Sequence, residues 1–358
     1  GNPPWWPGHD GSGGWLADHS PPSAVLYLPD RRQIMIGAPV AEAGDGVIFV
    51  DIDGRKKTGK RWVGGTFNGA SHLARDAGGT PCADYYAYSG CTGVGKSTEL
   101  RLYGYHAKGE TRIAEYAFPR AEDVELGGLA VHNGLLVASL PRLNQLLVVD
   151  VATKQVKGTL PVERPQGVAF DAQGRLLVVS GKTVLRATPA AVADLRWQAE
   201  TVIGAGLDDP RQLLVGPQGE LYVSDWGRSH QVKCFETDGR LRRVFGNPGG
   251  ARVGKYDPKS MQRPYGLSLD DAGRLWVAEF SYTPKRVSVW ASDGQFREAF
   301  YGPPAYGGGG TIDPQDRTRF YYADSRSGEG GTLEFALDWG TGESRPARAA
   351  RSAANRSN

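Results

Sequence analysis

A repeated turn motif in the middle of the chain constrains the fold more than any other feature of the sequence. The tetrapeptides DAQG, GPQG and DDAG begin at residues 171, 216 and 270, so successive copies are 45 and then 54 residues apart. Around each turn, short runs rich in β-branched and aromatic residues alternate with turns that contain glycine or aspartate. Each unit therefore supplies four successive strands, and this period is typical of a β-propeller.

Weaker copies of the repeat extend the pattern toward both ends of the chain. We predict an all-β fold, a seven-bladed β-propeller of four-stranded antiparallel blades at residues 21–342, with six or eight blades as alternatives. The blades are expected at about 22–62, 70–118, 126–162, 164–204, 209–246, 263–302 and 308–342. We expect residues 1–20, rich in tryptophan and histidine, to pack on the ring as a leader, and residues 343–358 to form a flexible tail.

The central units carry a pattern that is specific enough to suggest a family. They read RPxG(V/L)xxDxxGRL(L/W)V, followed by an apolar strand and then xDGxxxxxFG. This pattern resembles the NHL-repeat β-propeller family of the bacterial, secreted type, over roughly residues 164–302 and more loosely elsewhere. The resemblance implies a propeller located outside the cytoplasm, either extracellular or periplasmic. It implies no single activity, because this fold carries many unrelated functions.

Charge and composition argue against several classes of partner. The net charge is +3 and no run of five or more like charges occurs, so we expect no binding to nucleic acid. No apolar stretch reaches the roughly 18 residues that a membrane-spanning helix needs, so we expect no membrane span. The chain begins GNPPWW, which we interpret as a processed chain or a fragment. Cys82 and Cys91 are near enough in sequence to form a disulfide, which would leave Cys234 unpaired.

One stretch matches a nucleotide-binding motif. The segment YSGCTGVGKSTEL contains Gly90-x-x-x-x-Gly95-Lys96-Ser97, the pattern of a phosphate-binding loop. A working loop of this kind follows a strand and opens a helix, whose N-terminal amides hold the phosphate. The residues TELRLYGY that follow alternate like a strand, and Gly104 is unfavourable inside a helix. We therefore predict a strand after this loop and interpret the match, Gly90–Ser97, as a false positive for ATP or GTP binding.

A propeller brings two sets of loops together on one face, and ligand-binding side chains usually lie there. These are the loops that enter the innermost strands and the loops that join the second strand to the third. Arginine binds carboxylates in a two-pronged manner, and tryptophan stacks on sugar rings, so an acidic carbohydrate is one expected ligand. The residues predicted to bind it are Arg142, Arg164, Arg211, Arg228, Arg263, Asp225, Trp226, Glu279, Asp324 and Trp15. In the alternative interpretation, Asp225, Glu279 and Asp324 pair with these arginines and join neighbouring blades.

Two function hypotheses follow from this predicted face. The first is a secreted module, which could be part of a larger protein, that binds an acidic carbohydrate or another protein at the mouth of the central channel. The second is a polysaccharide lyase that acts by β-elimination on polymers containing uronate. Some lyases are propellers, and this similarity implies an arginine that neutralises the uronate, with histidine and tyrosine exchanging the proton. The candidates are His72 or His19 as base, Tyr265 or Tyr282 as acid, and Arg263 or Arg211 as clamp.

A third hypothesis is a metal-dependent hydrolase of the lactonase type. Its nearest carboxylate and amide equivalents are Glu42, Asn144, Asp225 and Asp324. Imidazole and carboxylate groups suit divalent metals such as Ca²⁺ or Zn²⁺, and the side chains of this kind near the predicted face are His9, Asp10, Asp18, His19 and His72. The spacing of these residues matches no metal motif, and we therefore predict no cofactor.

Overall fold

The computed structural model of the protein describes residues 20–39, 47–52, 56–60, 70–76, 85–90, 99–106, 109–301, 309–323 and 332–337. The described strands form seven four-stranded sheets. They are accompanied by the short helix α1 (Pro189–Ala193) and by the 3₁₀ turns η2 (Ala121–Asp123) and η3 (Pro141–Leu143). The prediction of an all-β chain built from four-stranded antiparallel sheets is confirmed for these residues.

The first three sheets follow the chain from the N-terminal side. The first contains β1 (Ala24–Leu28), β2 (Gln33–Gly37), β3 (Val47–Asp51) and β4 (Lys56–Lys60). The second contains β5 (Leu73–Arg75), β6 (Tyr85–Gly90), β7 (Glu99–His106) and β8 (Gly109–Ala117). The third contains β9 (Gly128–His132), β10 (Leu135–Leu140), β11 (Gln145–Asp150) and β12 (Gln155–Pro161).

The next three sheets repeat this order. The fourth contains β13 (Pro165–Phe170), β14 (Leu176–Ser180), β15 (Thr183–Ala187) and β16 (Ala199–Ile203). The fifth contains β17 (Pro210–Val215), β18 (Leu221–Asp225), β19 (Gln231–Phe235) and β20 (Leu241–Phe245). The sixth contains β22 (Pro264–Leu269), β23 (Leu275–Glu279), β24 (Arg286–Trp290) and β25 (Phe296–Tyr301).

The remaining sheet, here called the outer sheet, differs in its composition. It contains β26 (Gly309–Ile312), β27 (Arg319–Ala323) and β28 (Thr332–Ala336), together with β21 (Gly254–Lys255) from between the fifth and sixth sheets. Strand β21 pairs with β28 in parallel, whereas the other two pairings of the outer sheet are antiparallel.

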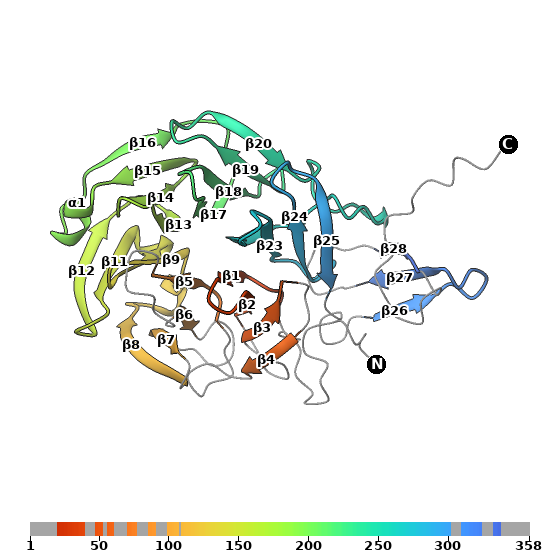
Figure 1. The fold of residues 1–358 in the computed structure, drawn as a ribbon, viewed down its shortest axis with the longest axis horizontal. Coiled ribbons are helices and arrows are strands. Elements are labelled where there is room, and N and C mark those ends of the chain that lie inside the picture. The colour runs from red at the N-terminus through yellow and green to blue at the C-terminus, as the bar shows by residue number, and fades with distance from the viewer. Residues whose placement is uncertain are drawn as a thin grey trace.

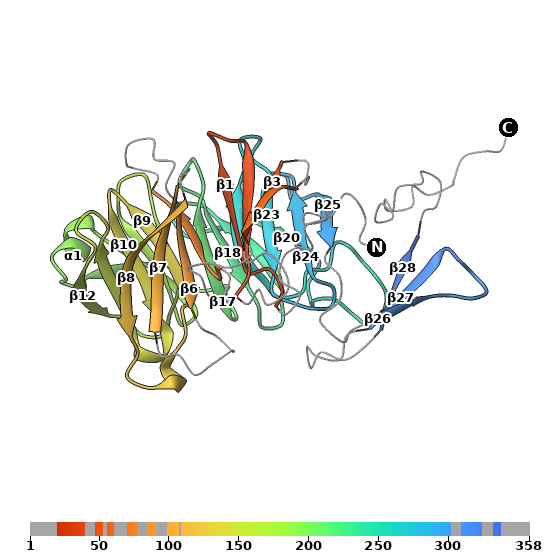
Figure 2. The same cartoon turned by 90° about the horizontal axis from the view of Figure 1, so that it is seen from below.

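Six sheets, the first to the sixth, are arranged around a common axis (Figure 1). Their innermost strands β1, β5, β9, β13, β17 and β22 contact one another in this order, and β22 contacts β1 in turn. This circular contact order is consistent with a propeller. The outer sheet lies beside the ring in both views (Figure 2). The predicted count of seven blades is therefore not confirmed, because the unit at 308–342 lies outside the circle of contacts.

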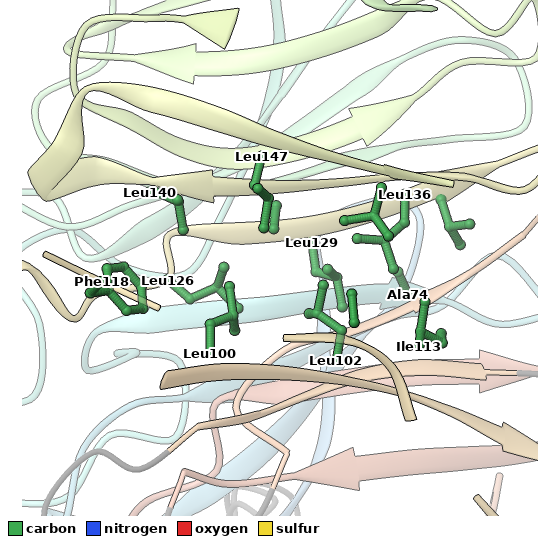
Figure 3. Close-up of a cluster of buried hydrophobic side chains, with 14 residues drawn as sticks. Ala74, Leu100, Leu102, Ile113, Phe118, Leu126, Leu129, Leu136, Leu140 and Leu147 are labelled. Carbon is green, nitrogen blue, oxygen red and sulfur yellow. The ribbon is translucent and has the colours of Figure 1, made fainter. Parts of the chain in front are cut away.

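Both faces of each sheet in the ring are buried against a neighbour, as the third sheet illustrates. Leu136 and Leu147 pack against the second sheet, where they meet Leu100 and Leu102 (Figure 3). Val137, which follows Leu136 in β10, packs against the fourth sheet instead. Successive side chains of a strand point to opposite faces. The runs LLVA at 135–138 and LLVV at 146–149 are therefore continuously apolar, because neither face is left to water.

The glycine of the RPxG motif allows neighbouring innermost strands to approach closely. A Cβ atom on Gly167 would lie 2.6 Å from the Cα atom of Gln212, and one on Gly266 would lie 2.5 Å from the carbonyl oxygen of Ser23. Backbone of the next innermost strand thus occupies the place of a side chain. The repeated glycine is explained by this packing between sheets.

We expect Gly167→Ala to lower the free energy of unfolding by about 1–3 kcal/mol, because the added methyl overpacks a backbone contact. Urea denaturation followed by circular dichroism measures the change. Gly204→Ala is the matched control, since its nearest neighbouring atom would be the Thr201 Cγ2 atom at 3.7 Å. Equal losses in the two variants would contradict the close approach at Gly167.

Several sequence predictions fall on parts of the chain that the structure does not describe. These are the leader before Ser20, the tail at 343–358 and the pairing of Cys82 with Cys91. Cys234 is buried and forms no disulfide among the described residues. The strand predicted after the phosphate-loop match is confirmed as β7, while residues 91–98 lie outside the described residues. In the part of the chain that is described, helices are too short or too polar to span a membrane.

Candidate functional site

The pairing of first and second strands brings the predicted site residues to one end of the ring. Pro210 at the start of β17 pairs with Asp225 at the end of β18, and Pro264 pairs in the same way with Glu279. The residues next to these pairs, Arg211 and Tyr265 on the innermost strands, therefore lie at the same end as the loops after β18 and β23. We call this end of the ring the mouth.

An aromatic group with two arginines lies at the mouth, in the fifth and sixth sheets. The ring centre of Trp226 is 5.8 Å from that of Tyr265 and 6.4 Å from that of Phe280. The guanidinium carbons of Arg211 and Arg263 lie 4.4 Å and 5.7 Å from the centre of the Trp226 ring. We call these five residues the Trp226 cluster. All five are partly exposed, so the cluster is available to a ligand.

Backbone hydrogen bonds fix the position of the cluster. The Trp226 indole N–H donates to the carbonyl oxygen of Pro264 at 2.7 Å, which holds the ring against the sixth sheet. The N–H of Arg263 donates to Nδ1 of His230 at 3.0 Å, and both residues have a positive φ of 49°. This conformation is costly for residues other than glycine, so the surrounding contacts must hold both loops firmly.

Polar side chains from sheets that are not neighbours meet across the centre of the ring. Nε2 of His72, just before β5, lies 3.1 Å from the hydroxyl oxygen of Tyr265 on β22. The Gln212 amide on β17 lies 3.4 Å from the same Nε2 atom and donates to the carbonyl oxygen of Gly127 at 2.5 Å. We call these contacts the axial crossing. Because they join the second, third, fifth and sixth sheets, they obstruct the axis at the mouth.

The axial crossing holds a neutral base against a neutral acid. Burial lowers the pKa of His72 to about 3, against a smaller opposing effect of a hydrogen bond with the Gly127 backbone. Burial also raises the pKa of Tyr265 to about 12. At neutral pH the imidazole is therefore unprotonated and the phenol is protonated. The structure thus brings together His72 and Tyr265, two of the four residues predicted as catalytic.

Asp225 is a predicted ligand-binding residue that the structure places inside the protein. Its carboxylate is fully buried and accepts hydrogen bonds from the backbone N–H groups of Asp208 at 3.0 Å and Asp209 at 2.7 Å. It also pairs with Lys233 of β19 at 2.6 Å. Asp225 therefore holds the loop that leads into β17.

Glu279 has the same role in the sixth sheet. It is fully buried, accepts from the N–H of Gln262 at 2.8 Å and pairs with Nε of Arg286 at 2.7 Å. Pairing of these carboxylates with arginines of the predicted site, the alternative interpretation from the sequence, is wrong for Asp225 and Glu279. Their partners are cations on the third strand of the same sheet. Both carboxylates position the mouth and face the interior.

Three predicted arginines form an exposed rim around the mouth. The side chains of Arg142, Arg164 and Arg228 are 65%, 68% and 97% exposed, respectively. Arg142 pairs with Glu125 at 2.7 Å, whereas Arg164 and Arg228 have looser carboxylate neighbours at 3.6 Å and 3.8 Å. These side chains are accessible to a large anionic partner.

The other predicted residues are not brought to the cluster. Tyr282 accepts the Tyr322 hydroxyl at its carbonyl oxygen, at 2.7 Å, and its ring centre is 5.2 Å from Nζ of Lys285. His19, Trp15 and Asp324 lie outside the described residues. Among the residues that the structure describes, no group of three or more histidine, cysteine or carboxylate side chains is placed to hold a metal. The absence of a cofactor, with Ca²⁺ or Zn²⁺ as the ions considered, therefore stays a prediction.

Sequence reasoning missed two residues of the mouth, Gln212 and Phe280. Gln212 stands where the fourth and sixth sheets have the glycine of RPxG, namely Gly167 and Gly266. The replacement of that glycine by a polar residue could have indicated that Gln212 has a role at the mouth. Phe280 gave a weaker signal, because it occupies the position of Trp226 one repeat later.

Comparison with known proteins supports the fold. No model of a protein family matches the chain, and no curated protein matches it. A structural genomics protein of unknown function from Bacteroides thetaiotaomicron is 15% identical, with 79% of this chain and 70% of that chain covered and a TM-score of 0.52. A functionally unknown protein from Desulfotomaculum acetoxidans is 14% identical, with 79% and 86% covered and a TM-score of 0.50. A chain of a nidogen/laminin complex is 17% identical, with 68% and 86% covered and a TM-score of 0.45. The first two alignments show a shared fold alone.

Proposed function

We propose that this chain is an NHL-like propeller that acts as a binding or interaction module, with its ligand at the mouth of the ring. The observation that carries this proposal is the Trp226 cluster, in which two guanidinium groups lie beside one partly exposed indole. Rigid strands hold the cluster and loops surround it, as is common for binding sites. The proposal includes the extracellular or periplasmic location that the resemblance implies.

The ligand that fits this surface best is an acidic carbohydrate. Aromatic side chains supply apolar contact for sugar rings, and arginine forks suit carboxylates. The exposed rim of Arg142, Arg164 and Arg228 extends the positive charge from the third sheet to the fifth, which suits a polymer better than a small ligand. The axial crossing obstructs the centre, so the polymer would lie across the mouth instead of threading the ring. A protein with an acidic surface is the other partner this rim would accept.

We expect Arg164→Ser/Arg228→Ser to weaken binding of polygalacturonate by about three- to tenfold, since each exposed charge contributes up to about 1 kcal/mol. The weakening should shrink at high salt, because exposed charges are screened. Isothermal titration calorimetry at two salt concentrations measures both effects.

The matched control for the rim is Arg32→Ser/Arg240→Ser. Both side chains are well exposed, at 66% and 78%, and both lie in strand turns at the end of the ring opposite the mouth. Methyl-esterified polygalacturonate is the ligand control, because it lacks most of the charge. Equal effects of the two double variants would show nonspecific attraction. Binding of no polymer by the unaltered protein would leave an acidic protein surface as the partner.

A second candidate, a lyase acting by β-elimination, is favoured by one contact. His72 and Tyr265 lie 3.1 Å apart, with the ionisation states that proton exchange needs, and Arg211 of the Trp226 cluster is near enough to influence the Tyr265 hydroxyl. Elimination creates a double bond conjugated to the uronate carboxyl, which absorbs in the ultraviolet. An ultraviolet absorbance that increases with time in the presence of polygalacturonate, and that does not increase with the His72→Gln and Tyr265→Phe variants, would support the lyase. Binding without such growth would support the module.

A further inference from the structure

The outer sheet ends in an edge strand, β26, whose far side pairs with no described strand. β26 pairs with β27 and is the last strand in the order β21-β28-β27-β26. The Asp313 N–H donates to the Arg319 carbonyl oxygen at 3.0 Å, and bonds between antiparallel strands recur at every second residue. Thr311 therefore bonds to β27, whereas the backbone N–H and C=O groups of Gly310 and Ile312 point to the open edge. The Ile312 carbonyl oxygen accepts a long bond from the Thr311 hydroxyl at 3.4 Å, and its second lone pair is available to a further donor.

This edge lacks the charges that the other described outer edges carry. The outermost strands of the ring are β4, β8, β12, β16, β20 and β25, and the other edge of the outer sheet is β21. Each contains at least one charged residue, such as Lys157 in β12 or Arg242 in β20. β26 reads GGTI. Charges on an edge strand hinder pairing with another chain, so β26 is the described edge most open to an added strand.

A second copy of β26 matches this edge. In an antiparallel pair, residues whose backbone groups point outward face one another, so Gly310 of each copy would pair with Ile312 of the other. This register places Thr311 opposite Thr311 of the second copy, which is a favourable pair across strands. It places Asp313 opposite Gly309, where the carboxylate meets no like charge. The strand is therefore complementary to itself about a two-fold axis.

The same register would cover an exposed apolar side chain. Ile312 is 38% exposed, and it lies on the same face of the outer sheet as Phe320, with which it is paired in register. A Cβ atom on Gly310 would overlap the Phe320 ring, so this ring covers the glycine. Residues opposite one another in an antiparallel pair share a face. Ile312 of one copy, opposite Gly310 of the other, would therefore reach the Phe320 ring of that copy.

The arrangement of the outer sheet leaves room for a second copy. The sheet lies beside the ring, and β26 and β27 run outward from the ring in both views (Figure 1, Figure 2). A two-fold axis at Thr311 turns the second copy end for end, so its ring would lie at the far end of the joined sheet. A two-fold dimer is also the commonest symmetric assembly of soluble proteins.

We propose that the outer sheet is a dimerisation surface, on which the β26 strands of two copies pair antiparallel about a two-fold axis at Thr311. The joined sheet has eight strands, and its centre contains four new backbone hydrogen bonds between Gly310 and Ile312 of the two copies. The proposal goes beyond the binding function and is independent of it, because β26 is not part of the mouth.

Sedimentation equilibrium over a range of protein concentrations tests the assembly. The unaltered protein is expected to form dimers as its concentration rises, and no larger species. Ile312→Pro is expected to raise the dissociation constant at least about tenfold, because the dimer loses two backbone hydrogen bonds. The Ile312 N–H makes no bond to β27, so proline is tolerated in the single copy. Ile312→Val keeps the N–H and should dissociate like the unaltered protein. A monomer at the highest soluble concentration, or equal dissociation of the two variants, would overturn the proposal.

An exchange of charge at the two-fold axis tests the register. Thr311 is exposed, so Thr311→Lys and Thr311→Glu should both fold, which circular dichroism checks. Each sets like charges opposite one another and is expected to weaken the dimer about three- to tenfold. A mixture of the two variants should form a mixed dimer that is tighter than either variant alone. Thr332→Lys is the matched control, since Thr332 is exposed on β28, away from the open edge. Dimers of unaltered strength in both Thr311 variants would show that another surface joins the copies.

Discussion

Replacement of Arg286 by leucine is expected to lower the free energy of unfolding by about 3–5 kcal/mol, the usual cost of breaking a buried ion pair on one side. Arg286 and Glu279 are both fully buried, and their Nε and Oε1 atoms are 2.7 Å apart. The Arg286 guanidinium also donates to the carbonyl oxygens of Pro258 and Ser260, each at 3.0 Å, and to the Tyr256 hydroxyl. Leucine would leave the Glu279 carboxylate and these acceptors buried with fewer partners. Urea denaturation measures the loss.

Arg319→Leu is the control for this loss. Arg319 pairs with Asp316 at 3.1 Å, but its side chain is 50% exposed. An exposed pair of this kind contributes about 0–1 kcal/mol, so the control should change stability little. The double variant Arg286→Leu/Glu279→Gln should recover part of the loss, since the unpaired charge is gone. If Arg286→Leu lowers the free energy of unfolding no more than Arg319→Leu does, the pair of Arg286 and Glu279 does not stabilise the fold in the way that its burial indicates.

The second large effect is expected in the pH dependence of stability. In the unfolded chain His72 titrates near its ordinary pKa of 6.5, whereas burial in the folded protein lowers the pKa of His72 to about 3. Between these values the unfolded chain binds a proton that the folded protein does not. The stability that goes with keeping His72 neutral is therefore fully present above the pKa of His72 in the unfolded chain. It is lost as the pH falls toward the pKa of His72 in the folded protein. At about 1.4 kcal/mol per pKa unit, the loss is on the order of 5 kcal/mol.

The experiment compares the unaltered protein with His72→Gln. Free energies of unfolding are measured by urea denaturation at several pH values between the two pKa values of His72. The unaltered protein should lose stability more steeply toward acid than His72→Gln, because carboxylates titrate in both proteins and cancel in the difference. His132→Gln, outside the mouth, should retain the steep curve. Parallel curves for the unaltered protein and His72→Gln would exclude a buried, neutral His72.

Much of the fold follows from local signals in the sequence. The units predicted at 164–204, 209–246 and 263–302 coincide with the fourth, fifth and sixth sheets to within a residue or two. Turn residues and continuous apolar runs are properties of each sheet alone, so they can be recognised one unit at a time. Closure of the ring is different, because it depends on which innermost strand packs against β1. Gly266 of β22 makes that contact, and the pattern of the last unit carried no information about it.

The candidate site was predictable where topology determines it. The start of each innermost strand must lie beside the end of the second, so Arg211, Tyr265 and Trp226 were placed correctly at one end. The partner of Glu279 was missed although the pairing register places Arg286 directly opposite it on the neighbouring strand. The axial crossing joins residues from sheets that are not neighbours, with His72 and Tyr265 separated by 193 positions. Spacing along the chain contains no record of such a contact.

The parallel pairing of β21 with β28 gives the outer sheet a mechanical connection to the mouth. Beyond β21 the chain runs through Tyr256, which touches the buried Arg286, and then reaches Gln262 and Arg263 beside the Trp226 ring. The segment is thus fastened at one end to the outer sheet and at the other to the mouth. A force applied to the outer sheet, by a tethered domain or a bound neighbour, would be transmitted through residues 254–263 to Arg263.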